Sequence, residues 1–264
     1  PDHFPKAKWR YVLTTCFMPY KCCDGEQGAQ PERRIGWIGH RQIVRRRPVS
    51  LVVRPLMISP TTNDLQNQAR FELLLTLDHQ KVVDQIRPFL FRPSMLTITY
   101  WGLNILTFAF LVVIWWKANY SLLNGFSIVC MGMLATWITL LPIHEHIHAF
   151  AYRSIGAKSV HVRYQLRTLT AQCVAPGFVT GSIPFAWVCL APFLVLNTAL
   201  LFGVLMLPNG PAKLFLAGGL LLHLGATSGD IGLANILWIL RGRRLWTYDD
   251  DSLGSTFFFA DFNR

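Results

Sequence analysis

Four long apolar runs dominate the second part of this 264-residue chain. They extend over Thr97–Trp116, Leu122–Ile143, Ile183–Leu207 and Leu214–Leu240, and none of them contains Lys or Arg. Because about 20 apolar residues are enough for a helix to cross a bilayer, the pattern predicts four transmembrane helices. A soluble domain of this size would not contain four such runs. The fold class that follows is mainly α, in a polytopic helical membrane protein.

The first 95 residues have a different pattern, in which no stretch is long enough to span a membrane. Short β-branched runs within Gly36–Ile58 predict a strand or hairpin. Asn63–Ile86 is predicted to form one amphipathic helix, with Asp64 as its N-cap and with Pro88 and Pro93 ending it. We therefore expect a small, mixed, basic cytoplasmic region over residues 1–95. A four-helix transmembrane domain with a short C-terminal tail should follow over residues 96–264.

The positive charge is distributed unevenly between the predicted loops. The loop between the second and third runs contains four Lys or Arg residues, and three Arg residues follow the fourth run. The other two loops contain only Lys117 and Lys213. Because basic loops stay on the cytoplasmic side, we expect a multi-pass integral membrane protein with both termini in the cytoplasm. The membrane would be a bacterial inner membrane or an organelle membrane.

The N-terminal region is the most basic part of the chain, with fifteen of its 25 Lys and Arg residues, including Arg41 and Arg45–Arg47. Basic clusters beside a membrane span bind anionic lipid headgroups. We therefore expect the lipid bilayer, and no nucleic acid, as the partner of this region. Three cysteines here are expected to be reduced and unpaired, with lipidation or metal binding as alternatives: Cys16, Cys22 and Cys23.

A His-Glu-x-x-His motif lies at the end of the second run, with His144, Glu145 and His148 as its fixed positions. On a helix, residues four apart lie on the same face, so the two histidines can direct their imidazoles at one metal ion. The Glu145 carboxylate lies beside them, where it can take a proton from the attacking water. His146 lies about 200° around the helix from His144 and should face away. The alternative is a polar helix end at the membrane surface, or an adventitious metal site.

Acidic residues are rare in the apolar part of the chain, where Glu145 and Asp230 are the only two between positions 95 and 240. An ionisable group inside a long apolar run is costly and is a candidate for function. At ~1.5 Å per helical residue, His144 and Asp230 lie roughly 14 and 16 Å from the basic residues that follow their runs. Because these depths agree, His144, His148 and Asp230 can converge on one Zn2+ ion, with a fourth position open for water.

At these residues the chain resembles the intramembrane site-2-type zinc metalloproteases. It is more similar to small polytopic bacterial proteins grouped under the name "putative zincin peptidase". The likeness covers roughly Met95 onward and is carried by His144–His148, Ala175-Pro176-Gly177, Ala191-Pro192 and Ser228-Gly229-Asp230. The Asn-Pro-Asp-Gly or Leu-Asp-Gly box of site-2-type proteases is absent, and Ser-Gly-Asp-Ile-Gly stands in its place. The resemblance implies zinc-dependent hydrolysis of a peptide bond within or near the membrane, with a membrane protein as substrate.

Residues 160–167, between the second and third runs, alternate apolar and polar side chains, which predicts a strand, and Pro176-Gly177 supplies a turn. In site-2-type proteases a β-hairpin at this place lies beside the metal and can pair with an extended substrate, and the resemblance implies the same role here. The alternative is a hairpin on the cytoplasmic surface.

Two polar residues of the last two runs are further candidates. His223 lies seven residues before Asp230 and nearly on the same face, so it can support a metal ligand. Asn197 can donate a hydrogen bond to an oxyanion. For both, a hydrogen bond between two helices is the alternative.

A function of another class is a non-catalytic zincin-like membrane subunit that acts as a scaffold in a larger membrane complex, with residues 1–95 as its docking element. The complete ligand set favours the enzyme, because a scaffold has little use for an acid within an apolar run. Metal transport would require more polar residues along a path through the helices than the chain contains.

Overall fold

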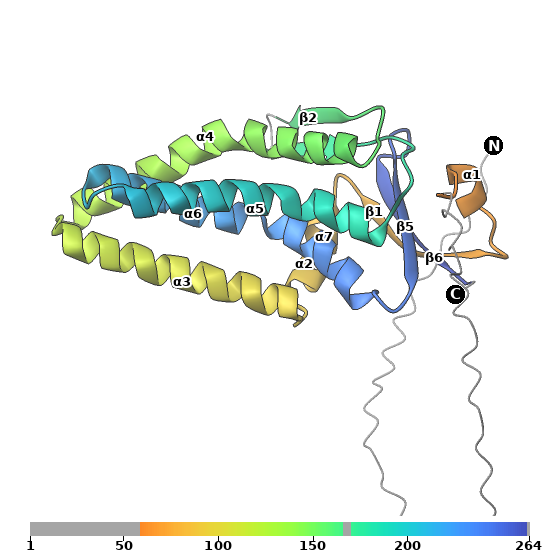
Figure 1. Ribbon diagram of the computed structural model, residues 1–264, viewed down its shortest axis with the longest axis horizontal. Helices are drawn as coiled ribbons and strands as arrows, with labels where there is room; N and C mark the ends of the chain where they lie inside the picture. The colour runs from red at the N-terminus through yellow and green to blue at the C-terminus, as the bar shows by residue number, and fades with distance from the viewer. Residues whose placement is uncertain (1–58, 166–169, 263–264) are drawn as a thin grey trace, which may run out of the picture. The chain divides into compact units, whose positions relative to one another are not determined.

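The computed structural model describes residues 59–165 and 170–262 (Figure 1). These described residues form one compact unit. Several predictions for the N-terminal region lie outside the described residues: the strand or hairpin within Gly36–Ile58, the Arg41 and Arg45–Arg47 cluster, and Cys16, Cys22 and Cys23.

Three long helices correspond to the first three apolar runs: α3 (Met95–Ala118), α4 (Leu122–Ser154) and α5 (Ser182–Met206). Each is long and apolar enough to cross a membrane. At the start of α3, Ser94 forms a capping box with the third residue of the helix. A short connection, in which Asn119 adopts a left-handed conformation with φ 52°, leads from α3 into α4. The apolar runs therefore predicted these three helices correctly.

The fourth apolar run forms two helices, α6 (Pro211–Ala226) and α7 (Ser228–Ile239), which are bent by 41° at the break between them. The fourth run was predicted to form one membrane span, and the pair counts as that span only if both helices are taken together. At the break, the Thr227 hydroxyl donates to the Leu224 carbonyl (2.8 Å), a bond that favours bending of a helix. The bend leaves Asp230 in the first turn of α7.

Small residues bring α4 and α6 into close contact. A Cβ added at Gly218 would lie 2.7 Å from the Val129 carbonyl oxygen, and one added at Gly132 would overlap the Phe215 carbonyl. Such close approach of two backbones is typical of helices that associate within a membrane. It brings His223, near the end of α6, to the face of α4 that carries the motif.

A four-stranded antiparallel sheet, in the order β1-β6-β5-β4, lies at one end of the long helices (Figure 1). Its strands are β1 (Phe71–Asp78), β4 (Thr180–Gly181), β5 (Arg244–Asp250) and β6 (Ser255–Asp261). Residues before the first long helix therefore share one sheet with residues after the last one. The segment expected to be a short C-terminal tail forms the two central strands.

The single helix predicted over Asn63–Ile86 is wrong. The chain instead forms the short helix α1 (Thr62–Leu65), the strand β1 and the helix α2 (Val82–Phe91). The N-cap of α1 is Thr61, whose side chain accepts a hydrogen bond from the backbone N–H of Asp64. Tertiary pairing of β1 with β6 therefore overrides the helical preference of its leucines.

A β-bulge explains why the strand was not recognised. The register of β1 against β6 shifts between Leu73 and Leu75. Buried and exposed side chains therefore do not alternate regularly along the strand between its two buried residues, Phe71 and Leu77. The prediction that Pro88 would end the preceding helix is also wrong, because α2 continues through Pro88 to Phe91.

The helix α2 packs against α7. The Asn235 side-chain amide of α7 donates to the backbone carbonyls of Phe89 (2.7 Å) and Arg92 (3.1 Å) at the end of α2. A Cβ added at Gly232 would overlap the Cγ2 methyl of Ile86, so the two helices can approach this closely only with glycine at that position. The short helix before the first long one therefore supports α7.

The predicted hairpin between α4 and α5 is confirmed, with β2 (His161–Gln165) paired to β3 (Thr170–Val174). Figure 1 shows β2 alongside α4. Pro176 and Gly177 follow β3 rather than joining the two strands. Gly177 adopts φ 68°, and its N–H donates to the Asp249 carbonyl (2.9 Å). This turn therefore attaches the end of the hairpin to β5.

Candidate metal centre

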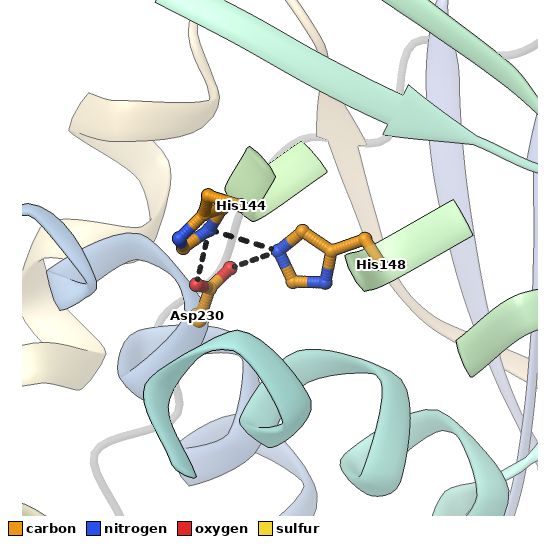
Figure 2. A group of neighbouring side chains, drawn as sticks. All are labelled: His144, His148 and Asp230. Carbon is orange, nitrogen blue, oxygen red and sulfur yellow. Dashed lines mark hydrogen bonds and ion pairs between the residues drawn. The ribbon is translucent and has the colours of Figure 1, made fainter. Parts of the chain in front are cut away.

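The side chains of His144, His148 and Asp230 meet between α4 and α7 (Figure 2). Nε2 of His144 lies 3.1 Å from Oδ2 of Asp230, and Nε2 of His148 lies 3.3 Å from Oδ1 of the same carboxylate. The two Nε2 atoms are 3.1 Å apart. Residues from the second and fourth apolar runs therefore reach one point, although 82 positions separate His148 from Asp230 in the sequence.

The spacing of these atoms fits a tetrahedral metal ion. Zinc binds imidazole nitrogen and carboxylate oxygen at about 2.0–2.2 Å, so two ligand atoms of a tetrahedron lie about 3.3–3.6 Å apart. The three observed separations, 3.1, 3.1 and 3.3 Å, are close to that range. Two neutral imidazoles and one carboxylate are a donor set of catalytic zinc sites, in which the fourth position is left for water. The group can therefore hold zinc.

The second ring nitrogen of His148 is held by the backbone of α5. Nδ1 of His148 donates to the Val188 carbonyl (2.9 Å). Because a carbonyl oxygen only accepts, Nδ1 carries the proton and Nε2 keeps the lone pair that faces Asp230. His146, by contrast, is exposed, and its Nδ1 lies 2.7 Å from the Pro142 carbonyl of its own helix.

Polar contacts lead from His144 to His223 and from His223 to Asn197 in the helix bundle. Nε2 of His223 lies 3.4 Å from Nδ1 of His144, and Nδ1 of His223 lies 2.9 Å from Oδ1 of Asn197. Both side chains are buried, with 4% of His223 and 8% of Asn197 exposed. The structure thus brings both predicted residues to the site, His223 by direct contact and Asn197 through His223.

The Glu145 side chain is buried on α4, with 6% of the residue exposed. The strand β3 packs against α4, the helix that carries Glu145. Burial raises the pKa of the Cys173 thiol of that strand to about 12, and the negative charge of Glu145 contributes in the same direction. The helix that carries the motif therefore contacts the hairpin.

A second buried carboxyl group, Asp249 of β5, fixes the chain that follows β3. It accepts hydrogen bonds from the Thr256 hydroxyl (2.7 Å) and from the Ala175 N–H (3.1 Å). Burial raises the pKa of Asp249 above its ordinary value, against the effect of these hydrogen bonds. Sequence reasoning missed this carboxyl group, because the segment that carries it was expected to be a short C-terminal tail.

The model of a protein family described as "Putative zincin peptidase" matches residues 137–242. The matched segment begins within α4 and extends past α7, so it includes the three residues that converge and the hairpin between α4 and α5. The likeness indicated by the motifs is therefore confirmed over this part of the chain. Searches among curated proteins and among solved structures found no match.

Proposed function

We propose that this protein is a zinc-dependent peptidase that hydrolyses peptide bonds within or beside a membrane. The observation that carries the proposal is the convergence of two imidazoles and one carboxylate at 3.1–3.3 Å on apolar helices. The buried Glu145 lies in the same motif. The family match over residues 137–242 supports a metallopeptidase, and the membrane-length helices support a substrate in or near the bilayer.

His144, His148 and Asp230 would hold the metal ion. Zinc, when bound, polarises the scissile carbonyl and lowers the pKa of the attacking water towards about 7. Glu145 takes the proton from that water and returns it to the leaving amine. Its side chain suits this role because it is buried beside the two histidines and is not one of the three converging groups.

The β2–β3 hairpin is the proposed docking surface for the substrate. A helical substrate must be extended before its amide is open to attack, and an extended segment can pair with a strand edge. The packing of β3 against α4 supports this role, because it places the hairpin against the helix that carries the proposed base. The hairpin is also held in place, since Arg163 forms an ion pair with Asp251 (2.6 Å) and Asp249 binds the residue after β3.

We further propose that α3, α4 and α5 cross a lipid bilayer, with the bent pair α6–α7 as a fourth span. Large apolar side chains are exposed along the three long helices, including Ile105 (68%), Ile138 (64%) and Phe202 (62%). Contact of such surfaces with lipid chains is favourable, whereas their contact with water costs free energy. By the positive-inside rule, both termini and the hairpin would lie on the cytoplasmic side. Anionic lipid headgroups are the proposed partners of the basic N-terminal region.

The substitution Glu145→Gln tests this function, because an amide keeps the size of the side chain but cannot accept a proton from water. Wild-type and variant chains would be produced in a host membrane, and newly formed protein N-termini would be compared by mass spectrometry. The zinc content of both purified proteins would be measured alongside. We expect equal zinc contents, and loss of the cleavage products in the variant.

His146→Gln is the matched control, because His146 is exposed and lies on another face of the same helix. It should give the zinc content and the cleavage products of the wild type. If Glu145→Gln gave the same new N-termini as the wild type, the peptidase would be refuted and the scaffold subunit favoured. Loss of assembly in His144→Ala would then assign a structural role to the metal.

A further inference from the structure

Pro192 interrupts the backbone hydrogen bonds of α5 beside the metal centre. In an α-helix the N–H of each residue bonds to the carbonyl four residues earlier. Because proline has no N–H, Pro192 leaves the Val188 carbonyl without its helical donor. It is this carbonyl that accepts the Nδ1 proton of His148 at 2.9 Å. The break in the helix thus provides the acceptor that His148 needs.

Asn197, further along the same helix, provides an acceptor for the other histidine through His223. When Oδ1 of Asn197 accepts the Nδ1 proton of His223, Nε2 of His223 can accept the Nδ1 proton of His144. Nε2 of His144 then keeps its lone pair. The reverse order, with the amide nitrogen donating to His223, would leave a proton on Nε2 of His144, and metal binding would have to displace that proton. The structure has the amide oxygen towards His223.

The other end of the Asn197 amide distinguishes this arrangement from an ordinary link between helices. Its Nδ2 atom is fully buried and has no hydrogen-bond partner among the residues that the structure describes. A buried donor left unpaired costs about 1–3 kcal/mol, and buried polar groups are generally paired. Asn197 therefore uses only its acceptor atom. That atom determines which ring nitrogen carries the proton, first in His223 and then in His144.

We infer that α5 prepares both histidines for metal binding, with Pro192 and Asn197 as its positioning residues. This inference rests on the metal site of the proposed function. Pro192 acts on His148 by freeing the Val188 carbonyl, and Asn197 acts on His144 through His223. Hydrogen bonds of this kind fix the ring orientation and tautomer of a metal-binding histidine, and their loss lowers metal affinity by about 10–100-fold.

The substitution Pro192→Ala restores an N–H that can bond to the Val188 carbonyl. Pro184→Ala is the matched control, because Pro184 lies in the first turn of the same helix, where no N–H is needed. Zinc affinity of the full chain would be measured by competition with a chelator, and thermal unfolding would be followed without zinc. We expect Pro192→Ala to lose about 10–100-fold in zinc affinity. The zinc-free protein should unfold at an unchanged or higher temperature, because alanine favours a helix.

A second pair of variants tests the path through Asn197 and decides the matter if Pro192→Ala does not fold. Asn197→Leu keeps the size but removes the acceptor and should lower zinc affinity, whereas Asn197→Asp keeps an acceptor and should retain it. Wild-type affinity in Asn197→Leu and Pro192→Ala, or an equal loss in Pro184→Ala, would overturn the inference. Failure of the wild-type protein to bind zinc would instead refute the metal site of the proposed function.

Discussion

Replacing Gly232 by alanine tests how firmly α2 supports the helix that carries Asp230. The new Cβ would overlap the Cγ2 methyl of Ile86 and would lie 3.6 Å from the Ile86 Cβ and carbonyl oxygen. Carbon atoms pack at about 3.5–4.0 Å, and isoleucine in a helix has one strongly preferred side-chain rotamer. Because the methyl group cannot turn aside, α2 must move away from α7.

Two opposing effects determine the size of the change. Overpacking of a buried contact costs about 1–3 kcal/mol, and replacement of a helical glycine by alanine stabilises by up to about 1 kcal/mol. We therefore expect Gly232→Ala to lower the free energy of unfolding by about 1 kcal/mol and Tm by about 2–4 °C. Gly229→Ala is the control, because a Cβ there would meet nothing within 4 Å, and it should raise Tm slightly.

The assay is thermal unfolding of the purified protein in detergent, together with zinc affinity. Ile86→Leu removes the Cγ2 methyl but keeps the side-chain volume, so adding it to Gly232→Ala should restore both quantities towards the wild type. The support of α7 by α2 would be refuted if Gly232→Ala and Gly229→Ala had the same Tm and the same zinc affinity.

Three further side chains and the metal itself give additional tests. Elemental analysis should find about one zinc per chain. The zinc should be lost when any of the three converging residues is replaced by alanine but kept in His146→Ala. Zinc retained in Asp230→Ala would contradict the ligand set. Because burial raises the pKa of Cys173 to about 12, iodoacetamide should modify it at pH 8 on the order of tenfold or more slowly than an ordinary cysteine. Glu145→Gln removes a negative charge that contributes to the raised pKa of this thiol and should speed the reaction. Equal rates by mass spectrometry would argue against this effect of the charge. Burial also raises the pKa of Asp249 from 3.8, so the folded chain keeps a proton that the unfolded chain releases. Stability should therefore fall as the pH rises from 3.8 through the folded pKa. This dependence would be measured as Tm at a series of pH values, and Asp249→Asn should remove it. If the variant kept the same dependence of Tm on pH, another group would be responsible for it.

The long helices and the converging residues could be predicted because their signals are local or chemically rare. His144 and His148 are one helical turn apart, and Asp230 is one of two acids in the apolar part of the chain. The apolar run does not itself predict the bend at Thr227, because the hydrophobic pattern is the same whether the helix is straight or broken.

The sheet and the acceptor of His148 could not be predicted for different physical reasons. The partner of β1 lies at the far end of the chain, and a bulge removes the alternation that would mark the strand. The acceptor is a backbone carbonyl, which every residue has, so Val188 carries no signal of its own. Only Pro192, four residues later, marks that carbonyl as free.

The pairing of β1 with β6 also determines the order in which the protein can be assembled during synthesis. Phe71 lies opposite Asp261, about 190 residues later, with every long helix between them. At about 5–20 residues per second, the ribosome needs roughly 10–40 s to produce the partner strand. During this interval β1 has no partner strand, because β6 has not yet been made. The hairpin also lacks its hydrogen bond to Asp249. The helices are therefore made before the sheet can close, and the attachment of the hairpin to β5 forms only after Asp249 has been synthesised.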